Sequence, residues 1–167
     1  MPSLEVFFDY ACPYCLIGHD YLRELLQQYP NIDVVWRPCE AHPRPENYSP
    51  HSDLCIQGLF FALEQGADTW EYHDRMFSAA LKERVNIEDP EVVAGCAYDM
   101  LDYTALLESL YSGRYEKALA DANDYAYERS GVWVVPAYRM DGKKLDSVEN
   151  VGVTKQQLTD FLAGNEK

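Results

Sequence analysis

The amino-acid sequence predicts an α/β fold, in which a sheet with flanking helices is interrupted by an inserted α-helical domain. Two features of length and pattern support this prediction. Strand-like segments lie near both ends of the chain, at residues 4–8, 32–36 and 132–148, and about five helical patterns follow one another between them. The chain has 167 residues, a length that suits one domain with an insertion.

The first forty residues have the pattern of a β-α-β unit. Leu4 to Phe8 is a short apolar run typical of a buried strand, and residues 13–29 carry apolar side chains at helical spacing. Pro13 falls in the first turn of this helix, where a proline is tolerated because the N–H that it lacks would have no partner. Residues 32–36 are rich in β-branched and aromatic side chains and predict a second strand.

The middle of the chain predicts an irregular connection and then a block of helices. Residues 37–50 contain four prolines, which disfavour a regular helix or a central strand. The helical patterns that follow occupy residues 52–65, 69–84, 89–101, 104–111 and 115–129. We therefore expect residues 1–40 and 131–167 to form the domain that contains the sheet, and residues 41–130 to form the inserted helical domain.

The strand pattern returns near the C-terminus. Residues 132–140 are strand-like, the Asp-Gly pair at 141–142 is a strong signal for a hairpin turn, and residues 145–148 supply the returning strand. Thr154 and Gln157 have the spacing of a capping box, which starts the last helix. The expected order of elements is therefore β-α-β, a run of helices, and β-β-α.

Charge and composition disfavour several classes of partner. The chain has 28 acidic and 14 basic residues and a formal net charge of −14, which repels nucleic acids and anionic lipid surfaces. No segment approaches the roughly 18 to 20 consecutive apolar residues of a membrane span. The start of the sequence lacks the basic and apolar regions of a signal peptide. We expect a cytoplasmic protein with neither nucleic acid nor membrane among its partners.

The clearest chemical motif is Cys12-Pro13-Tyr14-Cys15. The five cysteines form an odd set without the spacing of a disulfide framework, and only this pair is closely spaced. Its spacing alone is compatible with half of a metal site, a structural disulfide or a redox centre. A thiolate at a helix N-terminus is stabilised by the helix dipole and by free backbone N–H groups, so the pKa of Cys12 should be lowered. Cys15 lies one turn further on, where its thiol can attack a mixed disulfide on Cys12.

A zinc site is the main alternative for these cysteines. Cys39 and His42 form a Cys-x-x-His segment, which together with Cys12 and Cys15 would supply a Cys3His set of ligands. However, zinc ligands of this kind normally sit on tight turns in small modules, whereas Cys12 and Cys15 are fused to a strand and a long amphipathic helix. We therefore expect no metal and a redox centre.

Three other residues have simpler interpretations. Cys55 and Cys96 lie on apolar faces of predicted helices, where a free cysteine usually packs in the core. His19 follows Cys15 by one turn and would be placed to tune its thiol or to shuttle a proton. Its polar neighbours in the sequence favour a solvated position instead.

Pro136 is the second chemical feature, because it interrupts a segment that otherwise has the pattern of a strand. A proline removes a hydrogen bond from the ladder, so it is expected at a sheet edge, in a bulge or in the cis form. The sequence around it, VVPAYRMDG, leads directly into the predicted hairpin.

Together these features resemble the thioredoxin fold, and the long helical insertion resembles its DsbA branch. Asp9 to Gly18, DYACPYCLIG, is similar to the Asp-x-x-Cys-Pro-Trp-Cys-x-x-Gly pattern of the cytoplasmic FrnE-like proteins. Residues 36–40, WRPCE, are similar to their Trp-x-Pro-Phe stretch, which puts Cys39 at an apolar position. The resemblance covers the whole chain and implies a thioredoxin-like domain at residues 1–40 and 131–167.

The resemblance also implies roles for residues around the motif. Pro136 would be cis and face the active disulfide, and Val135 would bind substrate through its free backbone groups. Apart from the resemblance, Tyr10, Tyr14 and Trp133 are candidates to line a groove for a hydrophobic peptide, and packing in the core is an equally common role for aromatic residues.

The chain departs from the family pattern at two positions. Val6 stands where the periplasmic DsbA proteins carry a buried Glu for proton transfer, which leaves Asp9 as the nearest acid. Val134 stands where members often carry Gly. The related kappa-class glutathione transferases and 2-hydroxychromene-2-carboxylate isomerases share the insertion but lack the second cysteine, so the presence of Cys15 favours dithiol chemistry.

We therefore expect a thiol-disulfide oxidoreductase acting on protein or peptide thiols and disulfides, with Cys12 as nucleophile and Cys15 as resolving thiol. Its redox group would be the Cys12–Cys15 disulfide, without a bound cofactor. Because the motif lacks a His, we expect a reduction potential of roughly −200 to −230 mV, which favours reductase or isomerase activity in a reducing cytosol. Glutathione is a further candidate partner. Two alternatives stay open: a glutathione-dependent transferase or isomerase of the kappa-class type, and a peptide-binding protein without enzymatic activity.

Overall fold

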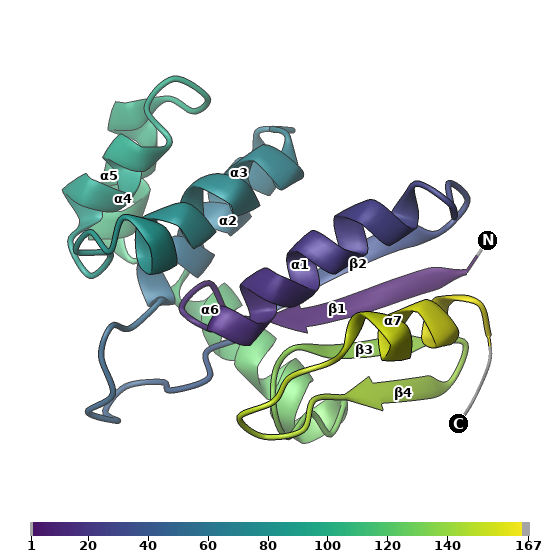
Figure 1. The fold of residues 1–167 in the computed structure, drawn as a ribbon. Helices are drawn as coiled ribbons and strands as arrows, with labels where there is room; N and C mark the ends of the chain where they lie inside the picture. The colour runs from purple at the N-terminus through teal and green to yellow at the C-terminus, as the bar shows by residue number, and fades with distance from the viewer. Residues whose placement is uncertain (1, 165–167) are drawn as a thin grey trace.

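The computed structural model describes residues 2–164, and these form a four-stranded sheet with helices on both faces and at one end (Figure 1). The elements in chain order are β1 (Ser3–Phe8), α1 (Pro13–Leu26), β2 (Asp33–Pro38), α2 (Asp53–Glu64), α3 (Thr69–Phe77), α4 (Pro90–Cys96), α5 (Tyr103–Ser112), α6 (Glu116–Asp124), β3 (Ala137–Met140), β4 (Lys143–Asp146) and α7 (Lys155–Leu162). The predicted α/β class and the predicted order of elements are confirmed.

β1 is an inner strand of the sheet, and both cysteines follow its carboxyl end. The strand order is β2-β1-β3-β4. β2 runs parallel to β1 with Trp36 beside Val6, and β3 runs antiparallel to β1 with Tyr138 opposite Val6. α1 is the crossover helix that a parallel strand pair requires. The carboxyl end of β1 therefore leads straight into the N-terminus of α1.

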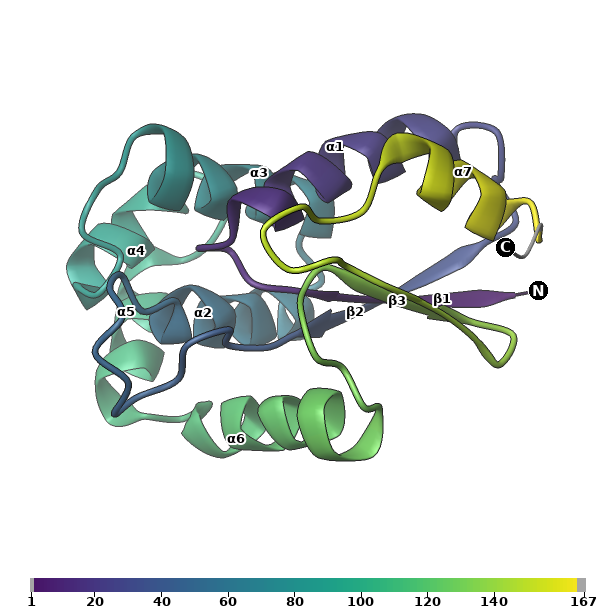
Figure 2. The same cartoon turned by 60° about the horizontal axis from the view of Figure 1, so that its bottom comes forward.

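Helices cover both faces of the sheet, and a helical block extends it at one end. Figure 2 shows α1 and α7 on one face, α6 on the other, and α2 to α5 beyond the carboxyl end of β1. The buried apolar side chains of the sheet and of the helical block form one continuous core. In the part of the chain that the structure describes, no helix is long and apolar enough to cross a membrane.

Local signals set several of the element boundaries. The capping box of α7 is confirmed, since the amide of Gln157 donates to Thr154 Oγ1 at 3.0 Å and the amide of Thr154 donates to Gln157 Oε1 at 2.9 Å. The hairpin turn is confirmed at Asp141 and Gly142, whose φ angles of 53° and 77° lie in the left-handed region. This short turn lets β4 begin at Lys143, two positions earlier than expected.

Two other expectations about elements need correction. The strand expected at residues 132–140 begins only at Ala137, because Pro136 has no N–H to contribute to a ladder. The helices expected at residues 69–84 and 115–129 each end in a π-helical turn, at Ser78–Lys82 and Tyr125–Arg129.

Candidate active site

Cys12 lies at the N-terminus of α1, directly after the end of β1. It is the N-cap residue of the helix, and its half-buried Sγ accepts a hydrogen bond from the amide of Cys15 at 3.3 Å. The same Sγ lies 3.8 Å from the carbonyl oxygen of Val135. Hydrogen bonds from the thiol and amide of Cys15 lower the pKa of Cys12, although burial opposes them. This is the direction expected for a cysteine at a helix N-terminus.

Cys15 is buried one turn further along α1. Only 2% of its surface is exposed, and its Sγ accepts a hydrogen bond from the amide of Asp9 at 3.5 Å. Burial raises the pKa of the Cys15 thiol well above its ordinary value. The pair thus combines an accessible thiol of lowered pKa with a buried thiol of raised pKa, an asymmetry that suits a nucleophile and a resolving thiol.

Pro136 packs behind the cysteines, at the start of β3. The Val135–Pro136 peptide bond is cis, as the resemblance implied. Gly18 of α1 permits the close approach of this segment, because a Cβ there would lie 2.5 Å from the hydroxyl of Tyr138 and 3.5 Å from Cγ of Pro136. Pro136 and Cys15 line the same small cavity.

A groove of about 470 Å³ opens beside Cys12. Tyr14 and Val135, both expected to contact substrate, line it, and the Tyr14 hydroxyl donates to the carbonyl of Asn150 at 2.8 Å. Trp133 lies at the rim with 84% of its surface exposed. The titratable side chains on the groove are acidic, tyrosine, cysteine or histidine; among the residues that the structure describes, neither Lys nor Arg lines it.

Tyr10 does not line this groove, so the expectation for that residue is wrong. Its side chain has no exposed surface, and its hydroxyl lies 2.7 Å from Nδ1 of His73 in α3. The rings of Tyr72 and Phe77 pack edge-on against it. The helical block covers Tyr10, and a peptide in the groove cannot reach it.

His19 is also buried, which overturns the solvated position favoured by its sequence neighbours. Only 6% of its surface is exposed. Its ring packs against Trp70 at a centroid distance of 4.9 Å, and its Nε2 lies 3.2 Å from Asp74 Oδ1. In the sequence, the spacing of four residues between Cys15 and His19 is the feature that indicates that His19 lies near the thiol. His73 carried no such signal, because α3 brings it to the site from a distant part of the chain.

The residues of the alternative zinc site have other surroundings. Cys39 is fully buried, and His42 is more exposed, with Nδ1 2.8 Å from a carboxylate oxygen of Glu46. Among residues 2–164, no group of three or more His, Cys, Asp or Glu side chains has the arrangement to hold a metal ion. Cys55 is fully buried in the core, whereas Cys96 is only half-buried.

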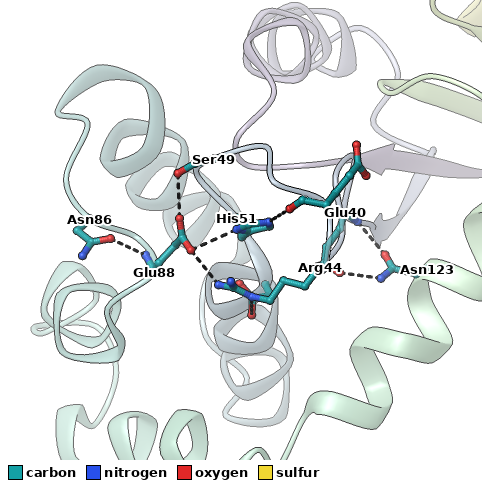
Figure 3. A network of polar contacts seen from close by, with 9 residues as sticks. Glu40, Arg44, Ser49, His51, Asn86, Glu88 and Asn123 are labelled. Atoms are coloured by element: carbon teal, nitrogen blue, oxygen red, sulfur yellow. Dashed lines mark hydrogen bonds and ion pairs between the residues drawn. The ribbon is translucent and has the colours of Figure 1, made fainter.

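A polar network that sequence reasoning missed holds one wall of the groove in place (Figure 3). Glu88 is its centre: its carboxylate accepts hydrogen bonds from Arg44 at 2.9 Å and from Ser49 at 3.1 Å, and lies 3.2 Å from Nδ1 of His51. The other ring nitrogen of His51 lies 2.7 Å from the carbonyl oxygen of Glu46. These contacts tie the proline-rich segment after β2 to the segment before α4.

A second pair of contacts anchors the same wall to α6. Asn123 donates from Nδ2 to Glu40 at 2.9 Å and accepts from the Glu40 amide at 2.8 Å (Figure 3). The carboxylate of Asp9 accepts from the amide of Ala41 at 2.7 Å and from the amide of Ala11 at 2.8 Å. Asp9 therefore joins the two backbone segments that flank Cys12 on the groove.

Comparisons with known proteins find similarity over nearly the whole chain. A family model for the DSBA-like thioredoxin domain matches residues 3–162. An uncharacterised protein of Bacillus subtilis, YwbO, is 24% identical over 193 residues, covering 94% of this chain and 96% of its own. Oxidised BdbD of Bacillus subtilis has a similar structure, with a TM-score of 0.78 and 13% identity over 98% of this chain and 86% of its own. The cytosolic disulfide reductase DsbM of Pseudomonas aeruginosa has a TM-score of 0.70 and 15% identity, covering 97% of each chain.

Proposed function

The chain belongs to the family of DSBA-like thioredoxin domains, and from this premise we propose that it is a thiol-disulfide oxidoreductase with Cys12 as nucleophile and Cys15 as resolving thiol. The observation that carries the proposal is the asymmetry of the pair. The Cys12 thiol borders an open groove and has a lowered pKa, whereas the Cys15 thiol is buried one helical turn away and has a raised pKa.

The reaction that this geometry supports has two steps. The Cys12 thiolate attacks a substrate disulfide, forms a mixed disulfide and releases one substrate thiolate. Cys15 then loses its proton and attacks Cys12 Sγ, which forms the Cys12–Cys15 disulfide and releases the second substrate thiolate. The substrate gains two electrons and the protein loses two. The same steps in reverse oxidise a substrate dithiol.

The groove supports a protein or peptide segment as the substrate. The Val135 carbonyl lies 3.8 Å from Cys12 Sγ, so an extended chain that pairs with this backbone passes directly over the nucleophile. The exposed rings of Trp133 and Tyr48 line the groove beside it and would contact apolar side chains of such a segment. Glutathione, which carries two carboxylates, would find no Lys or Arg on the groove among the described residues.

We propose that the protein acts as a reductase or isomerase in the cytoplasm. The Cys-Pro-Tyr-Cys motif adds no positive charge beside the thiolate, so we expect a potential near roughly −200 to −230 mV. DsbM, the structurally similar protein of Pseudomonas aeruginosa, is described as a cytosolic disulfide reductase. A measured potential above about −180 mV, the range of protein disulfide isomerase, would contradict this direction.

Reduction of insulin disulfides in the presence of dithiothreitol tests the proposed function. The wild-type protein should accelerate the precipitation of the insulin B chain, and Cys12→Ser should lose this activity. Cys55→Ser, which changes a buried cysteine that does not line the groove, is the matched control and should keep it. No acceleration by the wild-type protein would instead favour a binding protein without redox function, and equal acceleration by Cys12→Ser would contradict the role of Cys12.

A glutathione titration tests the related transferase activity. Saturable binding that persists in Cys15→Ser would favour a glutathione-dependent enzyme over dithiol exchange. The composition of the groove predicts no saturable binding.

A further inference from the structure

A small cavity lies on the inner side of the cysteine pair, where Cys15 rather than Cys12 forms part of its wall. Its volume is about 10 Å³, which is the room that one water molecule occupies. Nine residues line it, and the structure describes all of them. His19 and His73 are the two among them whose neutral side chain offers both a ring N–H and a basic ring nitrogen.

His19 is positioned to receive the proton of Cys15. The two residues are four positions apart in α1, so their side chains lie on the same face of the helix. Nε2 of His19 lies 3.2 Å from the carboxylate of Asp74 and 3.5 Å from Nη2 of Arg23. The nearer carboxylate is an acceptor and favours the tautomer with its hydrogen on Nε2, which leaves Nδ1 with a free lone pair. Among the described residues Nδ1 has no hydrogen-bond partner. Asp74 also accepts from Arg23 at 2.7 Å, and its side chain is 40% exposed, so it borders solvent.

His73 supplies a donor to the same cavity. Its ring is fully buried, and its Nε2 has no hydrogen-bond partner among the described residues. Its Nδ1 lies 2.7 Å from the hydroxyl of Tyr10. If Tyr10 donates this bond, one buried hydrogen lacks a partner, whereas the reverse arrangement leaves both the Tyr10 hydrogen and Nε2 unsatisfied. The first arrangement is favoured, because an unpaired buried polar group costs stability, and it places a hydrogen on Nε2.

We propose that one water in this cavity carries the proton of Cys15 to His19 when Cys15 resolves the mixed disulfide. The water accepts from the Cys15 thiol and from His73 Nε2–H and donates to His19 Nδ1, which gives it the three hydrogen bonds typical of a buried water. As the Cys15 sulfur bonds to Cys12 Sγ, the bond between Cys12 and the substrate sulfur breaks, and the substrate leaves as a thiolate. The proton then passes from His19 to solvent beside Asp74. This inference rests on the proposed function.

Burial and nearby charges favour the neutral form of both histidine rings. Burial lowers the pKa of His19, Arg23 adds to this effect, and Asp74 and Asp20 oppose it. Burial also lowers the pKa of His73 well below its ordinary value, together with His19 and Arg23. Both rings are therefore neutral at pH 7, so that His19 has a lone pair to offer.

The two thiol steps can be observed separately by stopped flow with an aromatic disulfide reagent that releases coloured nitrothiobenzoate. Attack by Cys12 releases one equivalent, and resolution by Cys15 releases the second. In His19→Gln the second phase should slow by at least about tenfold at neutral pH, and its rate should become proportional to hydroxide concentration, while the first phase stays within about twofold. Glu24→Gln removes an exposed acid from the same helix, whose carboxylate contacts Lys155 and not His19, and should leave both phases unchanged.

Two further variants make the test independent of any folding defect in His19→Gln. His73→Phe keeps an aromatic ring in the cluster and removes the donor, and Asp74→Asn changes a partly exposed residue; each should slow only the second phase. Second phases within about twofold of wild type, with the wild-type pH profile, in all three variants would overturn the proton route. The absence of a second equivalent from wild-type protein would contradict the proposed function itself.

Discussion

At the scale of single residues, position in one helical turn makes two identical side chains chemically different. Cys12 caps α1 and faces the groove, so amide and thiol hydrogen bonds stabilise its anion. Cys15 faces inward, and burial destabilises its anion. The largest influence on Cys12 is the hydrogen bond from the Cys15 thiol, which makes the second cysteine a regulator of the first.

This dependence predicts a difference between two substitutions of Cys15. Cys15→Ala removes the donor, so the pKa of Cys12 should rise. Cys15→Ser keeps a hydroxyl donor, so the pKa of Cys12 should be lower in this variant than in Cys15→Ala. The rate of Cys12 alkylation as a function of pH, followed by mass spectrometry, measures both values. The same inflection in the two variants would show that the helix N-terminus alone sets the pKa.

At the scale of elements, α2 and α3 pack closely because Gly58 has no side chain. The Tyr72 hydroxyl donates to the carbonyl of Cys55 at 2.7 Å. A Cβ on Gly58 would lie 2.1 Å from that hydroxyl and 3.2 Å from the carbon that bears it. The ring of Tyr72 is fully buried, so it has no free space into which to move.

Gly58→Ala should therefore destabilise the fold by about 1–3 kcal/mol, through overpacking and the displaced hydrogen bond. Gly95→Ala in α4 is the matched control, because a Cβ on this exposed residue would meet nothing within 4 Å. It should raise the free energy of unfolding by about 0.5–1 kcal/mol through helix propensity. Denaturant unfolding measures both, and equal changes would contradict this account of the α2–α3 contact.

The contacts of His51, in the segment that forms one wall of the groove, favour the protonated ring. Both ring nitrogens of His51 face oxygen acceptors, so only the imidazolium donates to both. The hydrogen bond to the Glu46 carbonyl is the largest cause that raises the pKa of His51 above its ordinary value. The partner, Glu88, has a pKa lowered to about 2 by its hydrogen bonds to His51 and Arg44, which outweigh burial.

The sign of the resulting pH dependence follows from the raised pKa. The contribution of His51 to stability is fully present below the pKa of an unfolded histidine, about 6.5, and is lost as pH rises through the higher folded value. The difference in unfolding free energy between wild type and His51→Gln should therefore shrink as the pH is raised from below about 6.5 to well above it. Glu88→Gln should reduce this pH dependence. A difference that stays constant over the range would rule out an imidazolium in the wall.

At the scale of the whole molecule, the helical block and the sheet meet at the active site. α3 brings Tyr72, His73 and Phe77 over the end of β1 and the start of α1, where they surround Tyr10. The division of the chain into residues 1–40 with 131–167 and residues 41–130 stays a prediction, as does the resemblance to the FrnE-like group.

The sequence was informative wherever a signal is local. Three features that depend only on neighbouring residues are confirmed by the structure. They are the start of α1 at Pro13, the turn at Asp141 and Gly142, and the capping box of α7. Tyr10 and His19 were misplaced because α3, more than fifty positions away, buries them, and no local pattern records that contact. The strand before Pro136 was overestimated, since apolar residues 132–135 have strand propensity but are followed by a residue that cannot join the ladder.

Trapping of the mixed disulfide tests the central claim most directly. Reduced Cys15→Ser protein is mixed with a peptide that contains one disulfide, and the adduct is located by mass spectrometry after the free thiols are blocked. We predict a stable adduct on Cys12, because the resolving thiol is absent, and none in the Cys12→Ser variant. No adduct, or adducts only on Cys39, Cys55 or Cys96, would contradict the assignment of Cys12 as the nucleophile of a dithiol oxidoreductase.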